Sequence, residues 1–145
     1  MVATLALAGL ILGPIPAAQG ISNRLTVNVN GLKANRGRIC YSLFSSSAGF
    51  PTSSQRAIRA ECIPVSASSS AIAFGDLSPG TYAVAVFHDK NSDGQLNKNS
   101  FGMPTEGFGF SQNPGISTGP PKFRDAAIFV AVSTSKVSIQ LNHLF

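Results

Sequence analysis

The chain has few of the residues that build catalytic and metal centres. It contains no tryptophan, two cysteines, two histidines and only 12% charged residues among its 145. A Ser-His-Asp or Cys-His arrangement therefore depends on His88, because His143 lies close to the C-terminus, and zinc would need a second His or Cys nearby. No basic run or recognition motif points to nucleic acid as a partner. This composition favours a non-catalytic module over an enzyme.

Long hydrophobic runs are also missing. The apolar run at 5–12 falls short of the roughly 20 residues that span a bilayer. It precedes small residues and a small-x-small site, Ala18-Gln19-Gly20, so residues 1–20 are predicted to be a secretory signal peptide, although no Lys or Arg stands near Met1. We expect export to the periplasm or the extracellular space, with no transmembrane segment after the leader is removed. A retained membrane anchor is the alternative.

Cysteine usage agrees with export. Cys40 and Cys62 are the only pair, and in an oxidising compartment such a pair forms a disulfide, worth about 3 kcal/mol for a loop of this size. Their spacing excludes a CxxC metal or redox motif. Two buried thiols that act as small core residues are the alternative.

Residues 21–145 are predicted to form one all-β domain. Apolar and polar residues alternate or run together in short segments at 25–30, 38–44, 57–65, 72–74, 81–88, 126–132 and 137–141. These seven segments, separated by turn signals and without helical periodicity, predict a seven-stranded antiparallel β-sandwich. The segment 81–88 is apolar on both faces and is expected in the middle of a sheet. The segment 57–65 contains Pro64 and is expected at an edge, and the last two segments are expected to pair with each other.

A long connection, 99–122, follows the central strand and shows no strand periodicity. Connections of this length are commonly functional. Its phenylalanines, Phe101, Phe108 and Phe110, are spaced by Gly102, Gly107 and Gly109. They are predicted to fold onto the sandwich as a lid that binds a sugar or an apolar ligand beside His88. A packed minor core beneath the loop is the alternative.

Three motifs carry a family resemblance. These are the PGTYA turn and strand at 79–83, the HDKNSDGQLN segment at 88–97 and the FGMPTEGFGFS loop at 101–111. With them, the chain from Leu25 to about Leu141 resembles a family of exported bacterial proteins known as domain of unknown function 2141. The resemblance implies a transthyretin-like or carboxypeptidase-regulatory-like sandwich, broadly Ig-like, and implies no established activity.

The segment 89–97 has the spacing of a calcium loop. Side-chain oxygens stand at the first, third, fifth and ninth positions, with glycine at the sixth and a backbone carbonyl from the seventh. The predicted calcium ligands are therefore Asp89, Asn91, Asp93, Gln95 and Asn97, joined by Glu106 folding back. The twelfth position is Ser100 where glutamate is usual, so binding in the roughly 10⁻⁴ to 10⁻³ M range is expected. An Asx-rich turn that bonds its own backbone is the alternative.

Three functions follow from these features. The leading one is a non-catalytic binding or structural module of the cell envelope, with an unidentified ligand or polymer as partner and its recognition surface between Asp89 and Glu106. A small hydrolase that uses Glu106, Asp89 or His88, with Asp125 as a second carboxylate, is one alternative. The formal charge of +5 is concentrated before Cys62, so adhesion to an anionic polymer or membrane surface through Arg36, Arg38 and Arg59 is the other.

Overall fold

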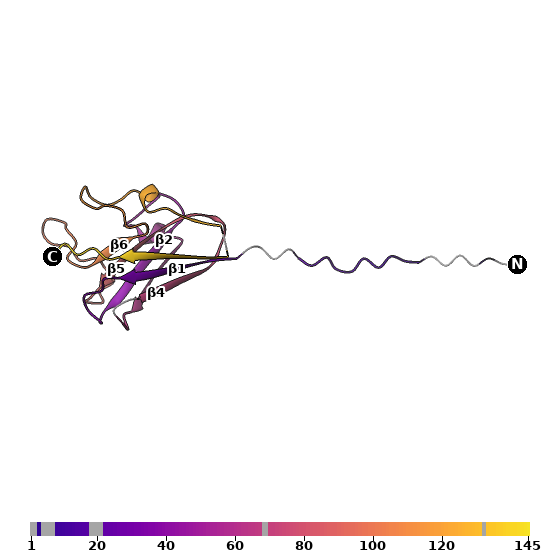
Figure 1. Cartoon of the computed structure of the whole chain (residues 1–145), viewed down its shortest axis with the longest axis horizontal. Helices are drawn as coiled ribbons and strands as arrows, with labels where there is room; N and C mark the ends of the chain where they lie inside the picture. The colour runs from indigo at the N-terminus through magenta and orange to yellow at the C-terminus, as the bar shows by residue number, and fades with distance from the viewer. Residues whose placement is uncertain (1–2, 4–7, 18–21, 68–69, 132) are drawn as a thin grey trace.

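The computed structural model describes residues 3, 8–17, 22–67, 70–131 and 133–145, and within them the chain forms eight strands in two sheets (Figure 1). The elements are β1 (Asn23–Asn30), β2 (Arg38–Phe44), η1 (Ser54–Arg56), β3 (Arg59–Pro64), β4 (Ser70–Leu77), β5 (Gly80–Asp89), β6 (Phe108–Phe110), η2 (Phe123–Asp125), β7 (Ile128–Val130) and β8 (Thr134–Gln140). The all-β prediction is confirmed.

One sheet has three strands in the order β4-β1-β8, and the other has five, with the order β3-β2-β5-β6 and β7 paired to β5. β5 is therefore central and β3 is an edge strand, as predicted from the sequence. The two inner faces enclose one core, in which Leu25 and Val27 of β1 and Ile139 of β8 pack with Leu43 of β2 and Val84 of β5. Each fully buried aliphatic side chain of this kind contributes about 1.5–3 kcal/mol. The arrangement is sandwich-like.

Two parts of the predicted topology are wrong. The number of strands is eight within the described residues and not seven, and β1 pairs with β8 in parallel, so the sheets are not wholly antiparallel. The extra strand, β6, lies in the connection that is predicted to have no strand. Its three residues are too few to show a period, and Gly109 is required because a Cβ there would lie 2.6 Å from Ile139 Cγ2.

The expected pairing of the last two strands is also wrong. β7 pairs with β5 in the larger sheet, whereas β8 pairs with β1 in the smaller one, so these two consecutive strands belong to different sheets. Alternation of apolar and polar residues indicates a half-buried strand but does not determine which strand it pairs with. Ser133-Thr134-Ser135, where the turn between these strands is expected, lacks the Asn-Gly or Asp-Gly pair that marks a tight hairpin, and Thr134 and Ser135 already belong to β8.

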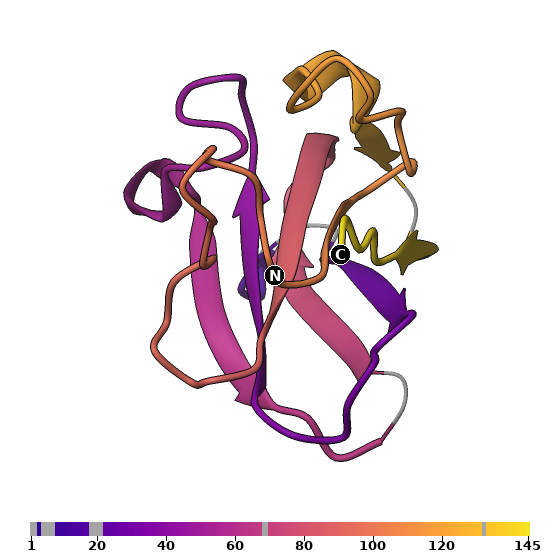
Figure 2. The same ribbon diagram turned by 90° about the vertical axis from the view of Figure 1, so that its left-hand side faces the viewer.

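The outer face of the five-stranded sheet is also apolar. Ala83 of β5 and Phe108 and Phe110 of β6 are buried there, in a second cluster that includes Phe50 and Phe87. Figure 2 shows the connection after β5 passing in front of β3 and β2 and returning across β5 before it reaches η2. The long connection thus covers this face, and Phe108 and Phe110 belong to a minor core, which is the alternative to a lid.

The N-terminal residues lie apart from the sheets. Residues 8–17 are exposed and carry no helix or strand, and Figure 1 shows them extending from the end of the molecule opposite to the C-terminus. The rest of the predicted signal peptide, apart from Ala3, lies outside the described residues. No helix in the described part of the chain has the length and apolarity needed to cross a membrane.

Candidate functional site

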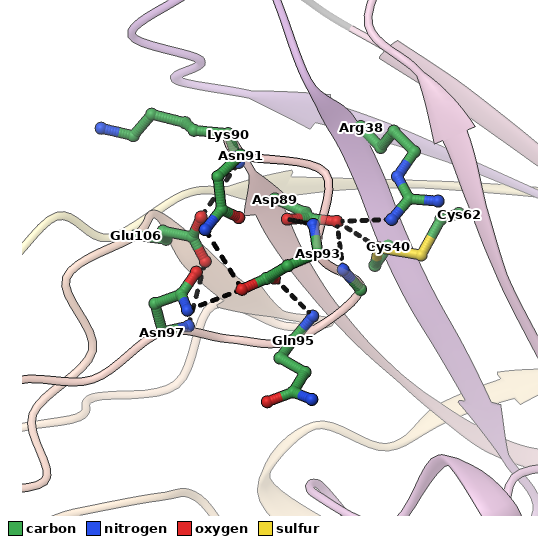
Figure 3. Close-up of polar contacts among 11 residues, drawn as sticks. Arg38, Cys40, Cys62, Asp89, Lys90, Asn91, Asp93, Gln95, Asn97 and Glu106 are labelled. Atoms are coloured by element: carbon green, nitrogen blue, oxygen red, sulfur yellow. Dashed lines mark hydrogen bonds and ion pairs between the residues drawn. A yellow bond between two sulfur atoms is a disulfide. The ribbon is translucent and has the colours of Figure 1, made fainter.

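The acidic loop, residues 89–97, is anchored at the end of β5 by a buried ion pair. The Asp89 side chain is fully buried, and its Oδ2 lies 2.9 Å from Arg38 Nη2 on the neighbouring strand β2. The same carboxylate accepts two backbone N–H bonds from its own loop, from Asp93 at 3.1 Å and from Gly94 at 2.8 Å (Figure 3). One side chain therefore joins two strands to the loop that follows them.

Glu106 closes the loop from its other side. Its carboxylate is nearly buried, and it accepts backbone N–H bonds from Lys90 and Asn97, each at 3.0 Å. Glu106 does fold back onto the loop, and both of its oxygens receive backbone donors there. The two buried carboxylates thus accept hydrogen bonds from four loop amides. These bonds offset the cost of burying the carboxylates, and buried polar groups are normally paired in this way.

Asp93 organises the exposed tip of the loop. Its Oδ1 accepts the Gln95 N–H at 2.9 Å, which is an Asx-turn, and its Oδ2 accepts the side-chain amides of Asn91 and Asn97 at 3.1 and 2.8 Å. These hydrogen bonds, the one from Asn97 above all, hold the pKa of Asp93 below its ordinary value. The contacts match the Asx-rich turn that is the alternative to a calcium loop.

Five of the six predicted calcium ligands lie in the acidic loop and Glu106 folds onto it, but the three carboxylates of this set do not converge. Among the described residues, the one group of three or more His, Cys, Asp or Glu ligand atoms that lie within 4.8 Å of one another is Cys40, Cys62 and Asp89. That group cannot hold a metal as it stands, since both sulfurs are used in a disulfide and offer no thiolate. In the loop, Asn97 Oδ1 is buried and accepts no hydrogen bond. The Gln95 side chain points away from the other ligands (Figure 3), but the predicted ligand of this residue is its backbone carbonyl.

The predicted Cys40–Cys62 disulfide is present, with an S–S distance of 2.00 Å. The two residues lie directly opposite each other on β2 and β3. Cys40 Sγ is 3.8 Å from Asp89 Oδ2, which is a packing contact because a disulfide sulfur carries no proton to donate. The bridge therefore borders the ion pair that anchors the acidic loop.

A groove of about 860 Å³ lies over the outer face of the five-stranded sheet. The strand register explains its floor, since Cys62, Cys40, Phe87 and Phe108 are neighbours across β3, β2, β5 and β6. A second row beside it consists of Ala60, Ser42, Ala85 and Phe110. The walls are completed by the acidic loop, the long connection and the C-terminus, with Leu96, Met103, Ile116 and Leu144 among the lining residues. The lining is mainly apolar.

Two of the four residues predicted to bind a ligand line the groove, namely Phe108 and Phe110. Phe101 is 86% exposed and is not among the lining residues. His88 is fully buried, and its Nε2 lies 2.7 Å from the Arg36 carbonyl oxygen. It follows Val84 and Val86 on the inner face of β5, which is why it lies away from the groove.

The structure does not bring the predicted hydrolase residues together. Neither His88, Asp89, Glu106 nor Asp125 lines the groove. The Glu106 oxygens bond to Lys90 and Asn97, whereas the Asp125 carboxylate accepts the Lys122 N–H at 3.1 Å in η2. These two carboxylates are used in separate local networks.

The arginines considered for polymer adhesion are also separated. Arg38 pairs in register with Pro64 and Arg59 pairs with Leu43, so they lie at opposite ends of the β2–β3 ladder. The two ends are five residue steps apart along the strand, which correspond to roughly 17 Å. Arg38 is also held by Asp89. Arg38 and Arg59 therefore do not form a single patch.

Sequence reasoning missed most of the groove. Phe87, Ala85 and the disulfide form its floor, and their signal is present in the strand 81–88, which is apolar on both faces. One apolar face of this strand packs in the core between the sheets. The other apolar face must be covered by a second layer, and the groove could have been predicted beneath that layer. The ion pair of Arg38 with Asp89 has no local signal, because the two residues are 51 positions apart.

These features define a small all-β protein of two sheets in which the outer face of the larger sheet carries a covered apolar groove. The chain belongs to the family of uncharacterized proteins conserved in bacteria designated DUF2141, whose family model matches residues 27–139. The resemblance inferred from the three motifs is thereby confirmed. No curated protein and no solved structure matches the chain.

Proposed function

We propose that the protein is a non-catalytic binding module that holds an apolar ligand in the groove over the outer face of the five-stranded sheet. The observation that carries this proposal is the floor, in which Phe87, Phe108 and the Cys40–Cys62 disulfide present an apolar surface that the long connection covers only partly. Binding of an apolar ligand to this surface is favourable, because it removes apolar area from water.

The size and lining of the groove support a small molecule. Its volume of about 860 Å³ lies within the roughly 300–1,000 Å³ of small-ligand sites. Such sites combine an apolar lining with a few polar groups, and here Ser42, Gln95 and Lys98 are among the lining residues. The hydrolase alternative gains no support, because none of its residues reaches this surface.

The first test is binding of diphenylhexatriene, a neutral apolar rod whose fluorescence rises when it leaves water. We expect saturable binding to the wild-type protein at micromolar concentrations. Ala60→Trp places an indole over the groove and is expected to weaken binding at least fivefold. Ala73→Trp is the matched control, since Ala73 is also an exposed alanine on an edge strand but lies in the other sheet and does not line the groove. Absence of saturable binding, or equal weakening in both variants, contradicts the proposal.

Calcium binding by the acidic loop stays a prediction. It is favoured by the spacing of oxygens in residues 89–97 and by Asn97 Oδ1, a buried oxygen with no donor. The hydrogen bonds of Asp89 and Glu106 already satisfy the loop amides, so we expect the loop to keep its fold in chelator. A site would recruit Asp93 and Asn97, which now bond to each other at 2.8 Å.

A thermal melt tests the calcium prediction. At ten times the dissociation constant, calcium is expected to stabilise the protein by about 1.4 kcal/mol, and Asp93→Asn is expected to remove the effect. Magnesium at the same concentration controls for ionic strength. Melting temperatures that agree in calcium, magnesium and chelator would leave residues 89–97 as an Asx-rich turn.

We further propose that the protein is exported to the cell envelope, where a ligand or polymer is its partner, and that its sandwich is of the transthyretin-like type. The disulfide supports export, because such bonds persist in oxidising compartments. The small-residue site before Ile21 supports cleavage there. N-terminal sequencing of protein recovered from cells is expected to begin at Ile21, and a sequence beginning at Met1 in all of the recovered protein contradicts export by this leader.

A further inference from the structure

We propose that the ligand is a single-chain amphiphile with an anionic head, whose chain lies in the groove and whose head is held by Lys122 and Arg124. This inference deepens the proposed function and rests on it. It comes from a second depression on the same side of the molecule, formed by segments that no local sequence pattern brings together.

The second depression adjoins the groove. It has a volume of about 530 Å³ and is formed by Ser47, Phe50 and Pro51 on one side and by residues 120–124 on the other. Pro51 and Pro120 line both the depression and the groove. An elongated ligand can therefore extend from one into the other across these two prolines.

The charges of the two parts differ. The groove lining contains one cation, Lys98, and one carboxylate, Glu61, whose charges cancel. The lining of the depression contains two cations, Lys122 and Arg124, and no carboxylate. An anionic group is therefore favoured at the depression and not in the groove itself.

Both cations are available to a ligand. Lys122 forms no ion pair with any described residue. Arg124 Nε lies 3.6 Å from Asp125 Oδ1, but the Arg124 side chain is 77% exposed, and an exposed pair at this distance contributes little. The guanidinium keeps further N–H donors that can bind a carboxylate or phosphate in a bidentate manner.

The aromatic residues of the depression offer an apolar surface for the part of the alkyl chain next to the head group. Phe50 packs edge-on against Phe123, with ring centroids 5.9 Å apart, and against Phe44 and Phe110 behind it at 5.3 and 6.1 Å. Phe110 also lines the groove. The apolar surface is thus continuous from beneath the two cations to the floor of the groove, which is the order of groups in an amphiphile with an anionic head.

Displacement of diphenylhexatriene by three ligands with the same alkyl chain tests this assignment. The ligands are laurate, dodecyl phosphate and the neutral 1-dodecanol, all below their critical micelle concentrations. We expect both anions to bind the wild-type protein about tenfold more tightly than the alcohol, as two partly exposed ion pairs allow. In Lys122→Gln/Arg124→Gln this preference is expected to disappear while dodecanol binding stays unchanged. Lys136→Gln, the control, removes an exposed cation of β8 that lines neither the groove nor the depression, and it is expected to retain the preference. Lys98→Gln tests whether the one cation of the groove binds the head instead.

The outcomes separate the two proposals. If dodecanol displaces the probe as well as the anions do from the wild-type protein, or if Lys98→Gln is the variant that removes the preference, the head-group assignment is overturned and the groove proposal stands. If no ligand displaces the probe and the probe itself does not bind, both are overturned. Loss of the preference at high salt in the wild-type protein supports the assignment, because exposed ion pairs are screened.

Discussion

Replacing Asp89 with alanine is expected to lower the free energy of unfolding by about 3 kcal/mol. The substitution removes the partner of Arg38 and the acceptor of the Asp93 and Gly94 amides at once. Breaking a buried ion pair commonly costs about 3–5 kcal/mol, and the lower end applies here because the Arg38 side chain is 34% exposed and can be rehydrated. Urea denaturation followed by circular dichroism measures the change.

Two further variants serve as controls for the effect of Asp89→Ala on stability. Asp89→Asn keeps the volume but loses the charge, so its stability is expected to fall between those of the alanine variant and the wild-type protein. Asp93→Ala removes an exposed carboxylate from the same loop and is expected to change the free energy of unfolding much less than Asp89→Ala does. An Asp93 effect as large as that of Asp89 would show that loop charge, rather than the buried anchor, stabilises this end of the molecule.

Removing the disulfide is expected to have an effect of similar size. Cys40→Ala/Cys62→Ala releases a loop closed by residues 22 positions apart, and chain entropy predicts a loss of about 3 kcal/mol. The six register pairs of β2 with β3 remain, so the native sheet is expected to survive without the bridge. The sulfurs also pack against Asp89, and their loss exposes the anchor of the acidic loop to more water.

Guanidinium denaturation of the wild-type protein, with and without a reducing agent, measures the same effect without a substitution. The reduced protein is expected to have the stability of the double variant, and the double variant is expected to be insensitive to the reducing agent. Equal stability of the oxidised and reduced wild-type protein would contradict the stabilising role assigned to the bridge.

Local patterns in the sequence predicted the parts of the fold that depend on local chemistry. β1 alternates Leu25, Val27 and Val29 with polar residues, and these three are fully buried. β5 is apolar on both faces and is central, and β3, which ends at Pro64, is an edge strand. The cysteine pair and the turn chemistry of residues 89–97 were also visible in the residue types.

The features that were predicted wrongly or missed depend on which distant segments of the chain contact one another. Nothing in β8 distinguishes β1 from β7 as its neighbour, because the same alternation suits either pairing. The groove is formed by residues from Cys40 to Leu144, so no window of sequence contains it. Phe101 and Phe108 are each followed by a glycine, yet the first is exposed and the second is buried against Phe87.

Occupation of the groove above β5 by a ligand can be tested directly, because the wild-type chain contains no tryptophan. Phe87→Trp places the only indole in the floor of the groove, whereas Phe129→Trp places it on β7 at a side chain that is 72% exposed and does not line the groove. A brominated fatty acid, whose bromine atoms quench nearby indoles, is predicted to quench the fluorescence of the Phe87→Trp variant saturably and to leave the Phe129→Trp variant unaffected. Equal quenching in both variants, or none in Phe87→Trp, would contradict ligand binding in the groove.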